Sequence, residues 1–240
     1  MQRISIAAAA SLFLTFTIST ATLAQEYTDG RSVVQASYEK TGGVAWSDVK
    51  TLVQTTSVAI NTPQGDISGS GRMTFLYPGY MHARMVFDIE DDAGLPMGAM
   101  TQVMTPDSGY AQSDMGRQEL PGAQAPNSPN EDGELLKNDS AEVSLESYDL
   151  NGEDVYRVVY ATESDTTTNY YDKETLYKVA TEVNTPQGPI WVHYDDYREV
   201  GGLLLPHKIT QEMAAGMRQI LTINSIEVNP EIDQETLFGM

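Results

Sequence analysis

The sequence predicts a mainly β protein of the α+β class, built on one strongly curved antiparallel sheet with one to three short helices. Apolar and polar residues alternate from Thr51 almost to the end of the chain, a period typical of half-buried strands. Turn signals such as NGE, DKET and GG separate the alternating runs, as in antiparallel hairpins. We therefore expect ten or eleven strands joined by tight turns.

The first 24 residues have the pattern of a secretory signal peptide. Arg3 precedes an uncharged stretch that ends in small residues, so cleavage is expected after about Ala24. A retained membrane anchor is the alternative, and the serines and threonines in the second half of the stretch disfavour it. Residues 25–240 then form a single domain. The chain has no cysteine, so we expect neither disulfides nor a lipid-modified cysteine anchor.

The chain is strongly acidic, with 14 basic and 34 acidic residues. Removal of Arg3 with the signal peptide leaves 13 basic residues and a formal charge of −21. Such a surface repels nucleic acid and anionic membranes and favours partners with basic patches. Adaptation to a salty habitat is an equally good explanation of the charge.

Local signals define the first elements. A helix is expected over Gly30–Lys40, with Asp29 as its N-cap and two glycines as its stop, and a second helical turn over VAWSDVK. Pro78 and Gly79 then predict a turn between two amphipathic strands. One face of this hairpin carries the larger apolar side chains, namely Met73, Phe75 and Tyr77 on its first strand and Met81, Ala83, Met85, Phe87 and Ile89 on its second.

Two further segments are predicted from turn chemistry. The motif NTPQG occurs at Asn61–Gly65 and again at Asn184–Gly188, and each copy is expected to form a hairpin tip. The segment Leu120–Asn138 is rich in Pro, Asn and Gly, with at most a short helix near Glu134–Lys137. We expect a flexible loop over residues 120–138, either a mobile flap or a plain disordered connection.

The second half of the chain resembles the LolA-like superfamily, the fold of periplasmic carriers of outer-membrane lipoproteins and of lipoprotein-sorting proteins. The resemblance rests on the run Tyr170–Thr210, which contains the DKET turn and the DYREVGGLLLPHKI hairpin, and on the ending EVNPEID before LF. Upstream, YEKTGGVAWSDVKTLVQTTSVAI resembles the entry helix and first strand of that family. The resemblance implies an incomplete β-barrel whose helices lie over its open side and whose apolar cavity takes acyl chains.

The function that this resemblance implies is binding of lipid or lipoprotein acyl chains and their transport between the inner and outer membranes. The protein is then expected in the periplasm, not lipid-anchored, as a monomer without a cofactor. Its partners would be an inner-membrane donor and an outer-membrane acceptor with basic patches. The alternative is an envelope sensor or protein-interaction domain that uses the same concave sheet without transport.

A methionine-rich wall is the candidate binding surface. Seven of the 11 methionines lie between Met73 and Met115, and methionine adapts its shape to chains of varied length. Met97 belongs to this predicted wall. The alternative is an ordinary core that uses methionine as a gap-filler. The lipid-binding residues are expected to be Trp46, Leu52, Met73, Phe75, Met81, Met85, Phe87, Met100 and Met104.

No motif predicts catalysis or metal binding. The histidines His82, His193 and His207 lie on separate expected strands without the spacing of a zinc site. SGSG at Ser68–Gly71 lacks the G-x-S-x-G elbow of a nucleophilic serine. The acidic stretch Asp88–Gly94 lacks the alternating ligands of a calcium loop. The protein is therefore not expected to be an enzyme.

Overall fold

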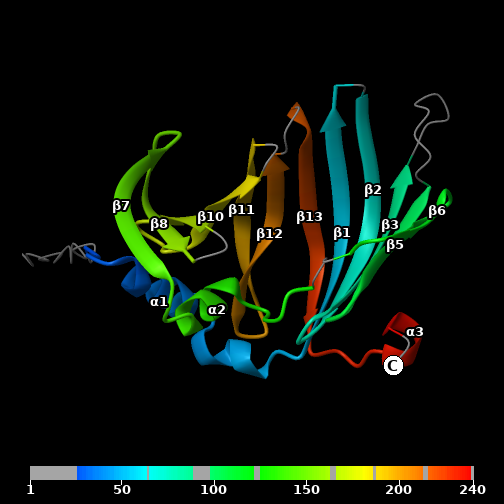
Figure 1. Cartoon of the computed structure of the whole chain (residues 1–240), viewed down its shortest axis with the longest axis horizontal. Helices are drawn as coiled ribbons and strands as arrows, with labels where there is room; N and C mark the ends of the chain where they lie inside the picture. Colours follow the sequence, from blue (N-terminus) through cyan, green and yellow to red (C-terminus); the bar gives the residue numbers. More distant parts are fainter. Residues whose placement is uncertain are drawn as a thin grey trace, which may run out of the picture.

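The chain folds into one antiparallel sheet of thirteen strands, which bends into an open half-barrel (Figure 1). The computed structural model describes residues 26–63, 65–88, 98–121, 125–162, 166–185, 188–212 and 216–238. The signal peptide prediction for residues 1–24 lies outside these ranges. The fold class expected from the sequence is confirmed, with more strands than the ten or eleven predicted.

Three α-helices and one 3₁₀-helix accompany the sheet. The helices are α1 (Gly30–Lys40), η1 (Gly43–Asp48), α2 (Glu131–Lys137) and α3 (Gln234–Phe238). The first six strands are β1 (Thr51–Thr62), β2 (Gly65–Leu76), β3 (Tyr80–Asp88), β4 (Ala99–Met104), β5 (Gly109–Ser113) and β6 (Gly116–Glu119). The other seven are β7 (Glu142–Leu150), β8 (Glu153–Ala161), β9 (Thr166–Asp172), β10 (Lys178–Thr185), β11 (Gly188–Val200), β12 (Leu203–Glu212) and β13 (Arg218–Val228).

The sheet consists of two meanders that meet in its middle. Strands β1 to β6 step outward in sequence order, and β7 to β13 step back until β13 pairs with β1. The edges of the sheet are therefore β6 and β7, and within the described residues these edges do not pair with each other. The segment between them, which contains α2, crosses the open side of the half-barrel (Figure 1).

Turn chemistry explains the tight links between strands. In both copies of NTPQG the threonine hydroxyl donates a hydrogen bond to the carbonyl of the motif's glycine, over 2.8 Å from Thr62 to Gly65 and 2.7 Å from Thr185 to Gly188. Both glycines have positive φ, 140° and 117°, which favours glycine at these positions. Gln64 and residues 186–187 lie outside the described part of the chain.

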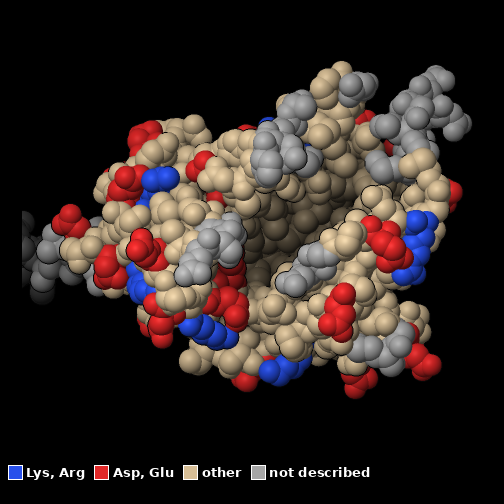
Figure 2. Space-filling model, viewed as in Figure 1, with Lys and Arg blue, Asp and Glu red and all other residues tan. Residues whose placement is uncertain are grey.

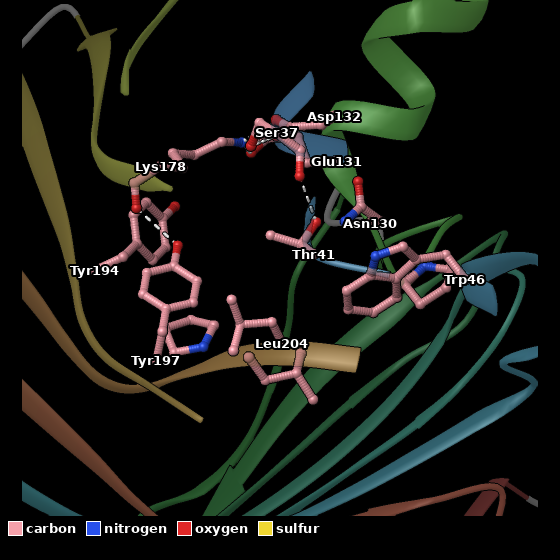
Figure 3. A pocket seen from close by; sticks show the side chains of 13 residues that line it. Ser37, Thr41, Trp46, Asn130, Glu131, Asp132, Lys178, Tyr194, Tyr197 and Leu204 are labelled. Atoms are coloured by element: carbon pink, nitrogen blue, oxygen red, sulfur yellow. Dashed lines mark hydrogen bonds and ion pairs between the residues drawn. The ribbon is translucent and has the colours of Figure 1, made fainter. Parts of the chain in front are cut away.

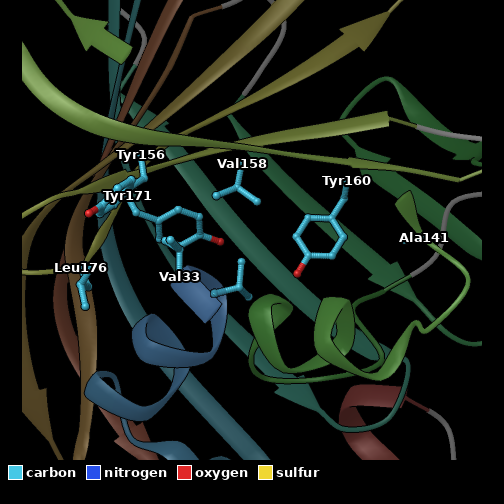
Figure 4. Close-up of a cluster of buried hydrophobic side chains, with 8 residues drawn as sticks. Val33, Ala141, Tyr156, Val158, Tyr160, Tyr171 and Leu176 are labelled. Atoms are coloured by element: carbon cyan, nitrogen blue, oxygen red, sulfur yellow. The ribbon is translucent and has the colours of Figure 1, made fainter. Parts of the chain in front are cut away.

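Helix α1 starts and ends where the sequence predicts. The Asp29 carboxylate accepts a hydrogen bond from the Ser32 backbone N–H over 2.9 Å, as expected for an N-cap. Val33 and Val34 are fully buried, and their cluster includes Val158 and other side chains of β8 and β9 (Figure 4). This contact makes α1 the main cover of the β7–β9 end of the sheet.

Helix α2 starts three residues earlier than the sequence predicts. The Asn130 side chain accepts a hydrogen bond from the Gly133 backbone N–H over 2.9 Å, so that the helix begins at Glu131. Leu135 and Leu136 pack against the α1 cluster. A flexible loop over residues 120–138 stays a prediction, because residues 122–124 lie outside the described ranges, but the α2 part of the segment is packed on the core.

Helix α3 lies on the opposite face of the sheet from α1. Phe238 meets the rings of Tyr80 and His82 edge-on, with ring centroids 5.6 and 6.4 Å away. This face carries the polar half of the β3 alternation, so α3 covers only a short apolar strip of it. The sequence predicted short helices over the open side alone, without α3 on the outside.

Candidate functional site

The predicted lipid-binding residues of the strands all lie on one face of β1–β4. Directly paired residues of an antiparallel sheet point to the same face, and so do residues two apart along a strand. One row of pairs runs Leu52–Phe75–Met81–Met104 across the four strands. Further along the strands, Met85 pairs with Met100. Met73 and Phe87 share this face by alternation with Phe75 and Met85.

This face is the concave side of the sheet. Trp46 of η1 packs against Leu52 and Phe75, and register carries the same face across β1 and β13 through the pair Val58–Leu221. The residues that α1 covers on β8 and β9 belong to the same face by register through β10–β12. The helices α1 and η1 and the predicted lipid-binding residues thus lie on one side of the sheet.

The predicted residues form two apolar groups on this concave face. Trp46, Leu52 and Phe75 belong to a buried cluster with Leu203 and Leu205 near η1. The second cluster, which we call the methionine cluster, lies further along the strands and consists of Val58, Ile67, Met85 and Phe87 with Ile60, Met73, Met100 and Leu221 around them. Met81 and Met104 are half-buried. Met97 and Ile89 lie outside the described residues.

Two glycines make room for the methionine cluster. Gly69 pairs with Phe87 and Gly71 with Met85. A Cβ added to Gly71 would lie 2.0 Å from the Met85 sulfur, and one added to Gly69 would lie 2.4 Å from the Val86 carbonyl oxygen. The glycines of the SGSG motif therefore serve packing: they let large side chains of β3 lie over β2.

The concave side of the molecule contains a deep hollow. Figure 2 shows it between the two walls of the half-barrel, and its visible floor carries neither acidic nor basic side chains. Acidic and basic groups lie instead around its rim and on the outer surface. Strand β13 contributes to this side of the sheet as well, because Leu221 packs against the methionine cluster and Ile223 shares its face.

A buried polar network beside the hollow was not foreseen from the sequence. Lys178 of β10, 8% exposed, lies with its Nζ 2.6 Å from the Asp132 carboxylate and 2.8 Å from that of Glu131 (Figure 3). Asp132, itself 5% exposed, also accepts hydrogen bonds from the hydroxyls of Ser37 and Tyr171, both over 3.0 Å. The network ties α1, α2 and the sheet together.

Electrostatics holds this network in its charged form. Burial lowers the pKa of Lys178, but the carboxylates of Asp132 and Glu131 outweigh that effect and hold the pKa well above its ordinary value. The same ammonium lowers the pKa of Glu131. Burial, followed by the Asp132 charge, raises the pKa of the Tyr171 hydroxyl well above its ordinary value. At neutral pH Lys178 is therefore a cation and Tyr171 a neutral hydrogen-bond donor.

Trp46 lies between two small cavities. It lines a cavity of about 170 Å³ beside the Lys178 network and a second of about 320 Å³ beside Tyr38 and Tyr77. Its side chain is 5% exposed, and its indole N–H has no hydrogen-bond partner among the described residues. Trp46 is thus a buried anchor of η1 beside the concave face, and its role in lipid binding stays a prediction.

The histidines do not converge. His82 lies against Phe238 on the outer face, and His193 stacks on Trp191, whereas His207 is buried with its Nδ1 3.0 Å from the Leu205 carbonyl oxygen. Within the described ranges no group of three or more His, Cys, Asp or Glu residues is arranged to hold a metal ion. None of the helices described is long and apolar enough to span a membrane.

The fold and its concave face define a class of structure: an open half-barrel made of a single antiparallel sheet, with an apolar inner side that short helices partly cover. Solved structures share this fold. A domain assigned to outer membrane lipoprotein sorting, from Vibrio parahaemolyticus, aligns with a TM-score of 0.58 at 12% identity, over 88% of this chain and 96% of its own.

Two further structures are similar over the same extent. A DUF1329 family protein from Desulfovibrio piger aligns with a TM-score of 0.61 at 10% identity, over 88% of this chain and 98% of its own. A LolA superfamily protein from Nitrosomonas europaea aligns with a TM-score of 0.55 at 9% identity, over 87% and 97%. The predicted resemblance to the LolA-like superfamily is confirmed as a likeness of fold.

Sequence comparison adds nothing to this likeness. No protein-family model matches the chain, and no curated protein matches its sequence.

Proposed function

We propose that this protein binds the acyl chain of a lipid or lipoprotein in the hollow of its half-barrel and carries it between the inner and outer membranes. The observation that supports the proposal most directly is the concave face itself, where the predicted apolar side chains share one face around a hollow that the helices leave open. The similar structure from Vibrio parahaemolyticus, assigned to lipoprotein sorting, points to the same ligand class.

Burial of one acyl chain supplies enough free energy for such a role. At about 0.8 kcal/mol for each buried CH₂, a chain of about twelve methylenes gains on the order of 10 kcal/mol before the ordering costs of binding. This gain is similar to what the chain has in a bilayer. Net extraction therefore requires a donor protein at one membrane and an acceptor at the other.

The other features of the sequence suit a periplasmic carrier. A cleaved signal peptide would export the chain, and the absence of cysteine leaves no site for a lipid anchor on cysteine. Its formal charge of −21 after that cleavage would keep it off anionic membranes and favour donor and acceptor proteins with basic patches. Binding of this kind needs no catalytic residue or cofactor.

The concave face can be tested with a fluorescent fatty-acyl probe. Met100→Glu and Met73→Glu each place a carboxylate at a half-buried position of the methionine cluster, and each should abolish probe binding, because a buried charge without a partner is strongly unfavourable. Met85→Leu should bind normally, because volume and apolarity persist.

The matched control lies on the same strand. Val86, between Met85 and Phe87, points to the opposite face and is 41% exposed, so Val86→Glu should fold and bind the probe as the unmodified protein does. If Met100→Glu and Met73→Glu fold, as judged by circular dichroism, and still bind the probe, the concave face is not the acyl-chain site.

A sensor or interaction domain without transport is the other function expected from the sequence. Mass spectrometry of lipids that co-purify with the mature protein from its native envelope separates the two. Stoichiometric acyl species support the carrier. A lipid-free protein that also takes up no acyl probe contradicts it.

A further inference from the structure

One cavity lies away from the hollow, in what we call the outer groove. Its volume is about 710 Å³, and it lies between the β7–β8 turn, the β9–β10 turn and the bend of β11. Leu150 and Val179 on its wall pack against the outer-face cluster of Tyr170 and Trp191. The groove therefore opens on the side of the sheet that α1 and α2 do not cover.

Aromatic rings form one wall of the outer groove. Tyr177 and Tyr197 lie with ring centroids 4.9 Å apart. The Tyr197 hydroxyl donates a hydrogen bond to the Lys178 carbonyl oxygen over 2.7 Å, which fixes its ring (Figure 3). Rigid tyrosine rings give a binding surface large contact area at little cost in conformational entropy.

The rim of the outer groove is acidic. The described residues that line the outer groove include the carboxylates of Glu153, Asp172, Asp195 and Asp196 and no lysine or arginine. Three of these four are exposed. The nearest compensating contact of Asp195 is Lys208, at 3.4 Å on the neighbouring strand. Asp196 forms an ion pair with Arg198, which lies beside the lining. The groove thus combines apolar and aromatic walls with a negative charge that neighbouring cations, among the described residues, balance only at Asp195 and Asp196.

We propose that the outer groove is a docking site for a basic segment of a partner protein that carries an apolar side chain among its lysines or arginines. The apolar side chain packs against Tyr177 and Val179, and the cations face Glu153 and Asp195. Charge complementarity of this kind fixes which partner binds and speeds its association. The proposal rests on the carrier function for one point, the identity of the partner as a donor or acceptor protein.

The position of the groove connects it with the inner side of the sheet. Tyr194 and Tyr197 line both the outer groove and the 170 Å³ cavity that contains Lys178. These two residues therefore lie between a segment bound outside and the network that fixes α2 inside. A partner in the groove contacts the two residues that back this network.

The test uses a fluorescein-labelled nonapeptide with one leucine between two runs of four lysines, and its binding to the full-length mature chain is followed by fluorescence anisotropy. The groove variant Glu153→Gln/Asp195→Asn should bind about tenfold more weakly. Tyr177→Ala, which changes no charge, should also weaken binding severalfold. A peptide with glutamate in place of lysine should not bind.

Two controls separate the outer groove from the rest of the molecule. Asp107→Asn/Asp114→Asn removes the same charge from exposed turns beside β5, at the far end of the strand order from the groove, and should leave peptide affinity unchanged. Met100→Gln, on the concave face, should also leave the peptide affinity unchanged. The groove variants should take up the acyl probe as the unmodified protein does. A protein that binds the peptide through the groove but takes up no acyl probe contradicts the carrier function alone. A protein that takes up the probe but binds the peptide equally well with and without the groove substitutions contradicts the docking site alone.

Three results would overturn the docking proposal. Equal weakening by both double variants would mean that the peptide senses only the overall charge. Absence of peptide binding would exclude the stated chemistry. Binding of a neutral oligosaccharide such as cellohexaose, lost in Tyr177→Ala, together with no peptide binding, would make the groove a sugar site.

Discussion

At the scale of single residues, the apolar concave face could be predicted from the sequence, and the buried Lys178 network beside it could not. Met85 and Phe87 belong to a local alternation, so their common face follows from the backbone of β3 alone. Lys178 lies in a segment whose alternation is typical of an ordinary amphipathic strand. Its partners Glu131 and Asp132 lie on a helix more than 40 residues earlier in the chain. Long-range charge pairs of this kind leave no periodic signal in a sequence.

The Lys178 network makes a strong prediction about stability. Lys178→Met leaves Asp132 buried without its counter-ion, so the free energy of unfolding should fall by about 3–5 kcal/mol, measured by urea denaturation. Lys137→Met removes a lysine whose pair with Glu134 is exposed and should change stability little. Adding Asp132→Asn to Lys178→Met should recover part of the loss. A wild-type urea midpoint for Lys178→Met would show that the network contributes no stability.

His82 gives the outer face a pH dependence. Burial, together with the positive charge of Arg84, lowers the pKa of His82 below its ordinary value of 6.5. The unfolded chain therefore binds the proton more tightly than the folded chain does. Above the pKa of His82 in the unfolded chain, His82 should leave stability unaffected. As the pH falls through this pKa and then through the lower pKa of the folded state, stability should decrease. The measurement is the urea midpoint at pH 7.5 and 5.5. His82→Gln should show a smaller drop between the two, and an unchanged drop would refute this assignment.

At the scale of elements, the structure departs from prediction where signals are short or lie far apart. Asp29 and the glycines after Lys40 are strong helix boundaries, and α1 obeys them. Helix α2 begins earlier because Asn130 caps it, and a proline-rich context concealed that cap. Strands β5 and β6 have only 5 and 4 residues, too few for a period of two to stand out, so the sequence predicted fewer strands than the sheet contains.

The glycines of β2 matter at this scale, because they decide how closely β2 and β3 can pack. Gly69→Ala should cost about 1–3 kcal/mol, typical of overpacking, since its Cβ would meet backbone atoms of Val86 and Phe87 at 2.4 and 3.0 Å. The exposed neighbour Ser70 points to the other face, so Ser70→Ala should be within about 0.5 kcal/mol of the parent. Chemical denaturation of both variants gives the comparison. Equal stabilities would mean that the two strands move apart freely.

At the scale of the whole molecule, the half-barrel results from the order in which the strands pair. The chain builds one wall from β1 to β6, crosses the open side, and builds the other wall back to β1. A single sheet with such a crossing leaves a concave apolar face that its short helices cannot fill. Alternation and turn signals predicted the curved antiparallel sheet, and the resemblance indicated the incomplete barrel, because alternation alone does not specify which edges of a sheet remain unpaired.

The charge of the whole molecule opposes its own compact state. With a formal charge of −20, folding brings carboxylates together, and their repulsion is screened by salt, whose Debye length is about 10 Å at 0.1 M and about 3 Å at 1 M. Sodium chloride should therefore raise the urea midpoint of the chain, and Asp107→Asn/Asp114→Asn should respond less. Chloride is the appropriate salt, because sulfate also strengthens apolar burial. A midpoint that falls with salt would mean that attractive ion pairs outweigh the repulsion, and the acidic surface would then stabilise the half-barrel.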